Sequence, residues 1–335
     1  MNRKVDAPNK KIDHSLCCWP VSERVIDEKQ HNKLYEACLP VFEEILKQEQ
    51  LDETLLEQLS ELYLPLTAWV ANKHTVKSIV IGINGAQGSG KSTLSKILKS
   101  LLSAVFNKSV VHLSIDDLYV SRQQREHLAK NIHPLLKVRG VPGTHDVELG
   151  KQVISKLVGL SDDTTVHIPR FNKAEDDLYS KEAWHPITES ADIILFEGWC
   201  VGSCEQHESE LIEHVNELEK NEDPDGTWRN HVNRQLAGPY QSLFSHIDYL
   251  VMLKVPDMES VFEWRSLQEE KLAMMCKHRD EPEFHLMTPS EISRFIMHYE
   301  RITRATLNEM PDRADVLLAL NKQHQICNIE IKACS

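Results

Sequence analysis

The run INGAQGSGKSTLSKIL at residues 83–98 constrains the fold of this chain more than any other segment. It matches the pattern G-x-x-x-x-G-K-[ST] in full, from Gly85 through Gly90 to Lys91 and Ser92. Glycines let the backbone approach an anion closely, and the N-terminus of the following helix favours negative charge. The pattern therefore predicts a phosphate-binding loop, which requires a strand before it and a helix after it.

The sequence on both sides of the loop agrees with this prediction. KSIVIGIN at residues 77–84 is a short β-branched run of the kind that forms a buried parallel strand. Downstream, apolar residues recur at steps of three and four, as on one face of a helix: Leu94, Ile97, Leu98, Leu101 and Leu102. The predicted nucleotide-binding residues are Gly85, Ala86, Gln87, Gly88, Ser89, Gly90, Lys91, Ser92 and Thr93. We expect Lys91 to reach the terminal phosphates of ATP and the Ser92 hydroxyl to bind Mg²⁺.

Further apolar runs alternate with helical patterns along the rest of the chain. They lie at residues 109–114, 165–171, 191–198, 247–255 and 314–321. This alternation predicts an α/β fold with a mostly parallel sheet and helices on both faces, of the kind seen in P-loop nucleotide-binding proteins. Helical spacing at residues 31–50 and 52–70 adds a helical N-terminal leader.

The predicted domain organisation follows from these patterns. Residues 1–75 form the helical extension, and residues 76–335 form the P-loop domain. Within that domain, the charged and weakly patterned residues 205–243 are interpreted as an insertion or mobile excursion between two strands. Residues 256–300 are interpreted as a lid-like helical segment.

Composition excludes several classes of partner. The 38 basic and 51 acidic residues give a net charge of −13, so a general nucleic-acid or membrane surface is not expected. No apolar run approaches the roughly 20 residues that a membrane-spanning helix needs. The 8 cysteines and 17 histidines have no zinc-site spacing, and the first residues lack an apolar secretion core. We therefore expect reduced thiols and a cytoplasmic protein.

Polar residues follow several of the predicted strands, at the edge where ligands bind in such sheets. Asp116 and Asp117 follow the second strand, Arg170 and Lys173 follow the third, and Glu197 ends the fourth. Carboxylates there suit Mg²⁺ or proton removal, and cations suit an anionic substrate. The alternatives are that the aspartates cap a helix and that Arg170 forms a surface salt bridge.

The chain resembles kinases of the phosphoribulokinase and uridine kinase superfamily, and more narrowly the D-glycerate 3-kinase family. The motifs that carry the resemblance are GAQGSGKST, SIDDLY, RGVPGTHD, IPRFNKAEDD, LFEGW and WRSLQEEKL, in order between residues 85 and 272. The resemblance implies that Asp116 is catalytic, orienting and deprotonating the acceptor hydroxyl. Glu197 ends an apolar strand, where a carboxylate is costly to bury without a cation, so we expect it to join Ser92 and Asp116 around Mg²⁺ and to be catalytic with Lys91 and Asp116. Asp117 is expected to be a cap or an indirect metal partner.

The resemblance also implies an acceptor site. It makes the RGVPGTHD loop a substrate loop, with Arg139, His145 and Asp146 as contacts beside Arg170 and Lys173. Two departures fall in this region: Asn172 stands where the family has Asp, and Leu178 and Tyr179 stand where it has Arg. Arg265 and Lys271 are candidate lid residues that would close over the phosphates.

The predicted function is therefore transfer of the γ-phosphoryl group of ATP, with Mg²⁺, to a hydroxyl of a small acidic metabolite, D-glycerate foremost. Lys91 would neutralise charge on the phosphates, and Arg170 would recognise the acceptor carboxylate. One alternative is a kinase for another small acceptor, such as pantothenate or a nucleoside. The other is a nucleotide-regulated binding protein or chaperone that hydrolyses ATP slowly.

Overall fold

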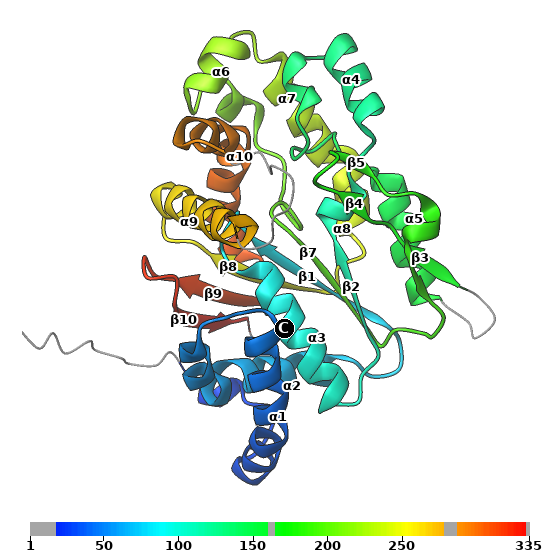
Figure 1. Cartoon of the computed structure of the whole chain (residues 1–335), viewed down its shortest axis with the longest axis vertical. Helices are drawn as coiled ribbons and strands as arrows, with labels where there is room; N and C mark the ends of the chain where they lie inside the picture. The colour runs from blue at the N-terminus through cyan, green and yellow to red at the C-terminus, as the bar shows by residue number, and fades with distance from the viewer. Residues whose placement is uncertain (1–17, 160–164, 278–286, 333–335) are drawn as a thin grey trace, which may run out of the picture.

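The computed structural model describes residues 18–159, 165–277 and 287–332, with the side chains of 271–277 excepted. Its centre is a six-stranded sheet with the order β10-β9-β8-β1-β7-β2 (Figure 1). The strands of this sheet are β1 (Ile79–Gly85), β2 (Val110–Ser114), β7 (Ile193–Gly198), β8 (Tyr249–Lys254), β9 (Val316–Leu320) and β10 (Ile326–Ile331). All neighbours are parallel except β10, which is antiparallel to β9. The mostly parallel sheet is thus confirmed, and β10 is an edge strand that the sequence patterns did not predict.

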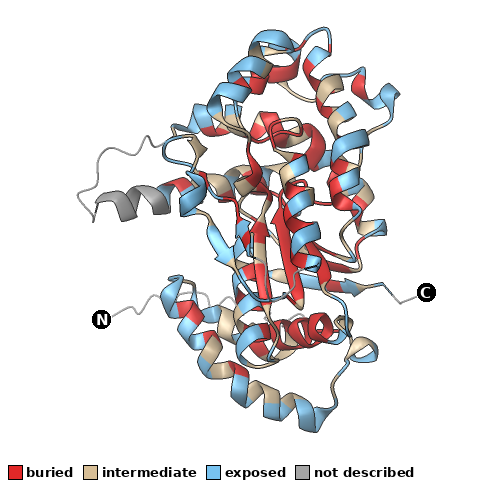
Figure 2. Ribbon diagram, turned by 90° about the vertical axis from the view of Figure 1, so that its right-hand side faces the viewer, coloured by how far each residue is buried: buried red, intermediate tan, exposed pale blue. Residues whose placement is uncertain are grey.

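Strand β1 lies at the middle of the sheet because both of its faces are apolar. Every one of its residues is buried, as expected for a parallel strand covered by helices on both sides. Side chains alternate between faces, so Ile81 and Ile83 join one hydrophobic core while Val80 joins the other. Figure 2 shows the buried residues concentrated along the sheet and on the helix faces turned toward it.

Helices cover both faces of the sheet. They are α1 (Glu28–Gln48), α2 (Leu64–Lys73), α3 (Lys91–Ala104), α4 (Arg122–Asn131), α5 (Val147–Val158), α6 (Glu217–Glu222), α7 (Thr227–Gln235), α8 (Gln241–Phe244), α9 (Met258–Lys277) and α10 (Pro289–Glu309). Buried residues of α1, α2 and α3 belong to the first core, and those of α5, α7 and α8 belong to the second. Helix α10 contributes to both, with Ile292 in the first core and Ile302 in the second.

The N-terminal helices share a core with the phosphate-binding loop. Phe42 of α1 and Val70 of α2 are fully buried, and they belong to the same cluster as Ile81 of β1 and Leu98 of α3. Helix α1 begins at a capping box in which the Asp27 side chain accepts the Gln30 N–H. The helical leader therefore packs onto the sheet unit as part of its hydrophobic core.

The expected strand at residues 165–171 is not part of the parallel sheet, and this prediction is wrong. The segment forms β3 (Val166–Ile168), antiparallel to β6 (His185–Ile187), and β4 (Phe171–Asn172), antiparallel to β5 (Asp177–Leu178). Pro169 separates β3 from β4 because proline has no N–H to donate to a ladder. These short pairs form an excursion between α5 and β7.

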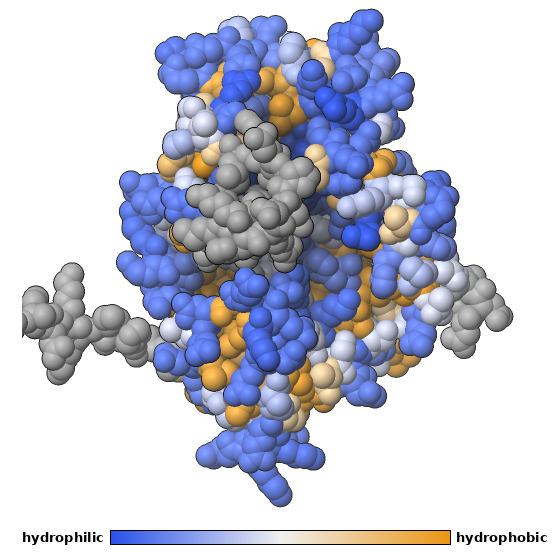
Figure 3. Space-filling view, in the orientation of Figure 1, coloured by the Kyte–Doolittle hydropathy of each residue, from blue (hydrophilic) through white to orange (hydrophobic). Residues whose placement is uncertain are grey.

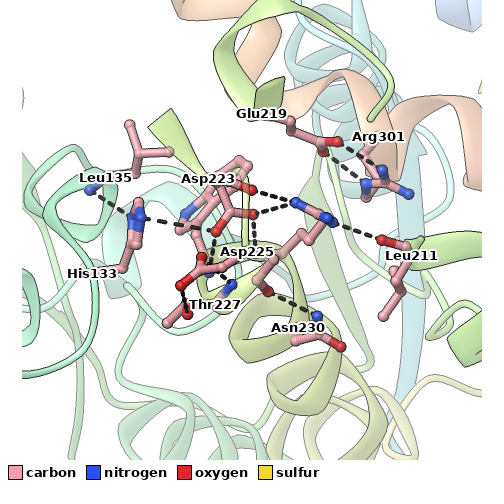
Figure 4. Close-up of polar contacts among 12 residues, drawn as sticks. His133, Leu135, Leu211, Glu219, Asp223, Asp225, Thr227, Asn230 and Arg301 are labelled. Atoms are coloured by element: carbon pink, nitrogen blue, oxygen red, sulfur yellow. Dashed lines mark hydrogen bonds and ion pairs between the residues drawn. The ribbon is translucent and has the colours of Figure 1, made fainter. Parts of the chain in front are cut away.

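The charged segment between β7 and β8 is helical and packed. Trp228 of α7 and Tyr240, the residue directly before α8, lie in the second core, so the segment packs against the rest of the described chain. Buried ion pairs attach it to its neighbours (Figure 4). Arg301 of α10 binds Glu219 of α6 through two hydrogen bonds of 2.7 and 2.6 Å.

A second buried pair closes the turn between α6 and α7. Arg229 donates to an Asp223 carboxylate oxygen over 3.0 Å and to the Leu211 carbonyl over 2.7 Å. The Nε2 atom of His133 lies 3.8 Å from the same Asp223 carboxylate, which attaches the turn to the segment after α4 (Figure 4). Because these charges are buried, removing one partner would leave the other without compensation.

The face shown in Figure 3 is mostly hydrophilic, with apolar areas scattered over it, some of them in the part formed by α1, α2 and α3. Within the described residues, no helix combines the length and the apolar character that a membrane span requires.

Candidate active site

The phosphate-binding loop has the geometry that its glycines predict. Gly88 and Gly90 adopt φ angles of 80° and 91°, the left-handed region that glycine enters without strain. A Cβ atom at Gly88 would lie 2.9 Å from the Cβ of Trp264, and one at Gly85 would lie 2.4 Å from the Ser89 hydroxyl. The loop therefore has no room for side chains at these positions, and it delivers the chain directly into the N-terminus of α3, where an anion is favoured.

Ser92 and Glu197 meet at the carboxyl edge of the sheet. The Ser92 hydroxyl donates to Glu197 Oε1 over 3.1 Å, and His112 Nε2 lies 3.9 Å from the same oxygen. Glu197 is 4% exposed, and its Oε2 atom has no hydrogen-bond partner among the described residues. A buried carboxylate oxygen without a partner is costly, so this pair fits a hydrated cation.

Mg²⁺ is the cation that this arrangement fits. In the described ranges, no three His, Cys, Asp or Glu side chains are grouped to form a complete metal cage. Mg²⁺ in kinase sites is held by one or two protein oxygens together with waters and substrate phosphates. Ser92 and Glu197 supply such oxygens beside the loop that would bind those phosphates.

Asp116 lies in η4 (Ile115–Leu118), directly after β2, with both of its oxygens engaged. Oδ1 accepts the Tyr119 hydroxyl over 2.9 Å, and Oδ2 accepts the Lys173 ammonium over 2.7 Å. Burial alone would raise the pKa of Asp116, but Lys173, Lys91 and Tyr119 together lower it to about 2. Asp116 is therefore ionised, and it lies within the field of the loop lysine.

Asp117 has a different environment from its neighbour. Its Oδ1 atom accepts the Phe171 N–H over 3.1 Å, which attaches η4 to β4. Burial raises its pKa above the ordinary value, and the Asp116 charge adds to that rise. The structure therefore gives Asp117 a positioning contact with the backbone.

The three candidate residues of the RGVPGTHD loop differ in their surroundings: Arg139 lies near Phe171 and His145 stacks on Tyr119, the residue that contacts Asp116. Arg139 pairs with Asp176, and its guanidinium lies 5.4 Å from the centre of the Phe171 ring. His145 is buried. Asp146 instead caps α5, where its Oδ1 atom accepts the Leu149 N–H over 2.9 Å.

Arg170 and Lys173 flank β4 and have different partners. Phe171 of β4 pairs with Leu178 of β5. Just beyond this pair, the Tyr179 N–H donates to the Arg170 carbonyl over 3.1 Å. The exposed Arg170 guanidinium lies 5.0 Å from the Tyr179 ring centre, while Lys173 contacts Asp116. The structure therefore brings Lys173, and not Arg170, to the predicted catalytic carboxylate.

Asn172 closes the turn between β4 and β5. Its side-chain oxygen accepts the N–H groups of Ala174 and Glu175 over 3.1 and 3.3 Å. An aspartate could accept the same two hydrogen bonds, so this departure from the family pattern preserves the turn.

Helix α9 lies against the phosphate-binding loop. Arg265 pairs with Glu269 over 2.7 Å, and its guanidinium lies 5.5 Å from the centre of the Phe295 ring in α10. Trp264 is the residue that faces Gly88. The other lid candidate, Lys271, lies outside the residues whose side chains are described.

Four aromatic residues near the site were missed by the sequence analysis. The Tyr119 hydroxyl donates to Asp116. Tyr119 belongs to the SIDDLY motif, and its spacing of three residues from Asp116 is the signal that could have predicted this contact. The Trp199 indole donates to the Gly140 carbonyl over 3.0 Å, and the Tyr299 hydroxyl donates to the Arg139 carbonyl over 3.2 Å. Tyr240 belongs to the segment interpreted as an insertion, and no local pattern marked it.

The parallel sheet, the loop at the end of β1 and the carboxylates at neighbouring strand ends define a P-loop nucleotide-binding protein with a phosphotransferase-type site. The comparisons with known proteins agree. A family model described as "KAP family P-loop domain" matches residues 61–221. The kinase mug58 of Schizosaccharomyces pombe is 34% identical over 232 residues, covering 67% of this chain and 79% of its own. The chain therefore belongs to the family of P-loop kinases that includes mug58.

Two further proteins are similar to this chain. The chloroplastic D-glycerate 3-kinase of Arabidopsis thaliana is 28% identical over 232 residues, and the match spans 64% of this chain and 48% of the plant enzyme. A solved structure of a D-glycerate 3-kinase from Cryptococcus neoformans superposes with a TM-score of 0.66 at 21% sequence identity, over 79% of this chain and 96% of that one. At this identity the second likeness shows the fold.

Proposed function

We propose that this protein transfers the γ-phosphoryl group of ATP to a hydroxyl of a small acidic metabolite, with D-glycerate as the first candidate. The observation that carries the proposal is the ionised Asp116, paired with Lys173 and within the field of Lys91. A carboxylate beside a phosphate-binding loop can orient an acceptor hydroxyl, and a cation beside that carboxylate can bind an acidic acceptor. The plant relative named as a D-glycerate 3-kinase supports the choice of acceptor.

Each residue of the site has a part in this reaction. Lys91 neutralises charge on the terminal phosphates, and Ser92 and Glu197 would hold Mg²⁺. When bound, Mg²⁺ supplies charge neutralisation to the phosphoryl oxygens. Asp116 orients the acceptor hydroxyl, and because its pKa of about 2 makes it a weak base, orientation is its main contribution. A loose phosphoryl transition state requires little proton removal.

The acceptor carboxylate would bind the cations that the structure brings to Asp116. Lys173 contacts the Asp116 carboxylate directly, and the Arg139 guanidinium lies 5.4 Å from the centre of the Phe171 ring. We therefore propose Lys173 and Arg139 as the anion-binding residues, with His145 as a further contact. Arg170 instead lies beside the Tyr179 ring, and Asp146 has a structural part as the cap of α5.

The test is ATP consumption by the purified protein with Mg²⁺ and a panel of acceptors. We expect D-glycerate to accelerate consumption, while neutral sugars, nucleosides and pantothenate do not. Lys91→Ala is the control, and it should lower the accelerated rate on the order of 100-fold by removing a preorganised cation. Acceleration by a nucleoside or pantothenate, and by no hydroxy acid, would replace the acceptor. Acceleration by a macromolecular partner alone would replace the kinase proposal.

A further inference from the structure

His145 lies one aromatic ring away from Asp116. Its imidazole stacks on the Tyr119 ring, with centres 4.5 Å apart and planes at 24°. The Tyr119 hydroxyl in turn donates to Asp116. The backbones of Tyr119 and His145 also form an isolated antiparallel bridge. A backbone bridge and a ring contact therefore both fix His145 beside Tyr119, within the proposed acceptor site.

The hydrogen bonds around Tyr240 determine which nitrogen of His145 carries the proton. The Tyr240 hydroxyl oxygen accepts the Gly143 N–H over 3.0 Å, and it lies 2.6 Å from His145 Nδ1. Tyr240 is fully buried, and of the two groups that its hydroxyl contacts among the described residues, His145 Nδ1 is the one that can accept its proton. The Tyr240 hydroxyl therefore donates to Nδ1, which leaves the imidazole proton on Nε2.

The Nε2–H group of His145 is a buried donor without a partner among the described residues. The side chain is 5% exposed, so bulk water does not satisfy this donor. Burial lowers the pKa of His145 to about 4, although the nearby Asp116 charge acts in the opposite direction. The ring is therefore uncharged near neutral pH, where it can donate a hydrogen bond but cannot shuttle a proton. A buried unpaired donor points to a ligand oxygen.

We propose that His145 presents Nε2–H as a fixed donor to an oxygen atom of the acceptor, and that Tyr240 is the positioning residue that sets this tautomer. The identity of the acceptor in this inference rests on the proposed function. The tautomer of His145 does not, because it follows from the hydrogen bonds of Tyr240. The ligand atom it requires is a carboxylate or hydroxyl oxygen, which an acidic hydroxy compound supplies. An amine or an apolar group at the same place would leave the donor unsatisfied.

The tautomer can be measured without any activity. A two-bond ¹H–¹⁵N correlation spectrum of ¹⁵N-labelled protein distinguishes a protonated Nε2 from a protonated Nδ1, and the signals missing from His145→Gln assign the residue. We expect the Nε2–H form in the wild-type protein and a mixture of tautomers in Tyr240→Phe. A wild-type Nδ1–H form would overturn the inference, whatever the acceptor proves to be.

Two amide variants test the donor itself. The Gln amide of His145→Gln can reach the position of Nε2, whereas the shorter amide of His145→Asn reaches the position of Nδ1. With D-glycerate as the probe, we expect His145→Gln to keep the acceptor KM within about threefold and His145→Asn to raise it about tenfold, the equivalent of one hydrogen bond. The ATP KM should change in neither. Equal effects of the two variants on the acceptor KM would overturn the donor assignment.

Tyr240→Phe completes the test of the positioning residue. Its KM for D-glycerate should rise about tenfold while its ATP KM stays within about twofold, since the tautomer is no longer fixed. A parallel rise in both constants would indicate a structural role and overturn the proposal for Tyr240. If this variant does not fold, the amide pair and the wild-type spectrum still decide the inference. If wild-type protein does not phosphorylate D-glycerate, the proposed acceptor fails while the spectrum decides the tautomer.

Discussion

At the scale of single residues, two adjacent aspartates differ because their surroundings differ. Asp116 is bound by Lys173 and Tyr119, which keep it ionised, whereas Asp117 accepts a backbone N–H and has a raised pKa. Both lie in the 3₁₀ turn η4, where successive side chains project about 120° apart. The same Asp→Asn substitution at the two positions therefore compares a proposed catalytic carboxylate with a neighbour that contacts the backbone.

Asp116→Asn should lower kcat on the order of 100-fold, because a neutral amide no longer orients the acceptor hydroxyl beside Lys173. Its ATP KM should change little, since Asp116 acts on the acceptor. Asp117→Asn should be mild, because the amide oxygen can still accept the Phe171 N–H. Steady-state kinetics of both variants make the comparison, and a larger loss in Asp117→Asn would reverse the assignment.

His145 should make the folded state sensitive to acid. Its pKa is about 4 in the folded protein, against 6.5 in the unfolded chain. The unfolded state therefore binds more protons between these values, so this contribution to stability is complete above about pH 6.5 and is lost as pH falls toward 4. At pH 5 the loss should be about 2 kcal/mol.

Urea unfolding of the wild-type protein and His145→Gln at pH 7 and pH 5 measures this effect. The fall in unfolding free energy between the two pH values should be smaller in the variant by that amount. Equal falls would show that the imidazole titrates normally in the folded protein.

At the scale of elements, α10 is attached to α6 by two ion pairs of different burial. The pair of Arg301 with Glu219 is buried, while Arg294 and Glu222 have side chains that are 50% and 40% exposed. A buried charge that loses its partner remains desolvated, whereas an exposed one returns to water. Helix α10 also supplies Tyr299, which holds the loop containing Arg139.

Glu219→Gln should therefore lower the free energy of unfolding by about 3 kcal/mol, because Arg301 would stay buried beside a neutral amide. Glu222→Gln is the matched control on the same helix, and it should cost under about 1 kcal/mol. Urea unfolding at neutral pH gives both values. Similar costs for the two variants would mean that the buried pair is no stronger a constraint than the exposed one.

At the scale of the whole molecule, two hydrophobic cores lie on either side of one sheet. The first core joins α1 and α2 to the strand and helix that flank the phosphate-binding loop. Cores that share buried side chains across segments usually unfold together. The N-terminal helices are thus expected to stabilise the nucleotide-binding unit.

Phe42→Ala tests this expectation, because Phe42 is a buried residue of α1 in the first core. Removing a fully buried phenylalanine should cost about 3–5 kcal/mol. Far-UV circular dichroism and tryptophan fluorescence should show one coincident transition at a lower urea concentration. Two separate transitions would instead indicate that the helical leader unfolds by itself.

The sequence by itself determined the features that short patterns encode. The glycine spacing and the β-branched run predicted β1, its loop and α3, because each depends on residues close together in the chain. The alternation of apolar runs predicted the mostly parallel sheet. The carboxylates at residues 116 and 197 were found because the end of a parallel strand is a fixed place in such a sheet.

The tertiary structure decided what depends on distant contacts. The segment forms a short antiparallel pair and not a parallel strand, and in this arrangement Lys173 contacts Asp116 while Arg170 lies beside Tyr179. The site around His145 combines segments near residues 119, 145 and 240, and no local spacing connects them. Hydrogen bonds and ring contacts between such segments exist only once the chain is packed, which is why Tyr240 left no signal in the sequence.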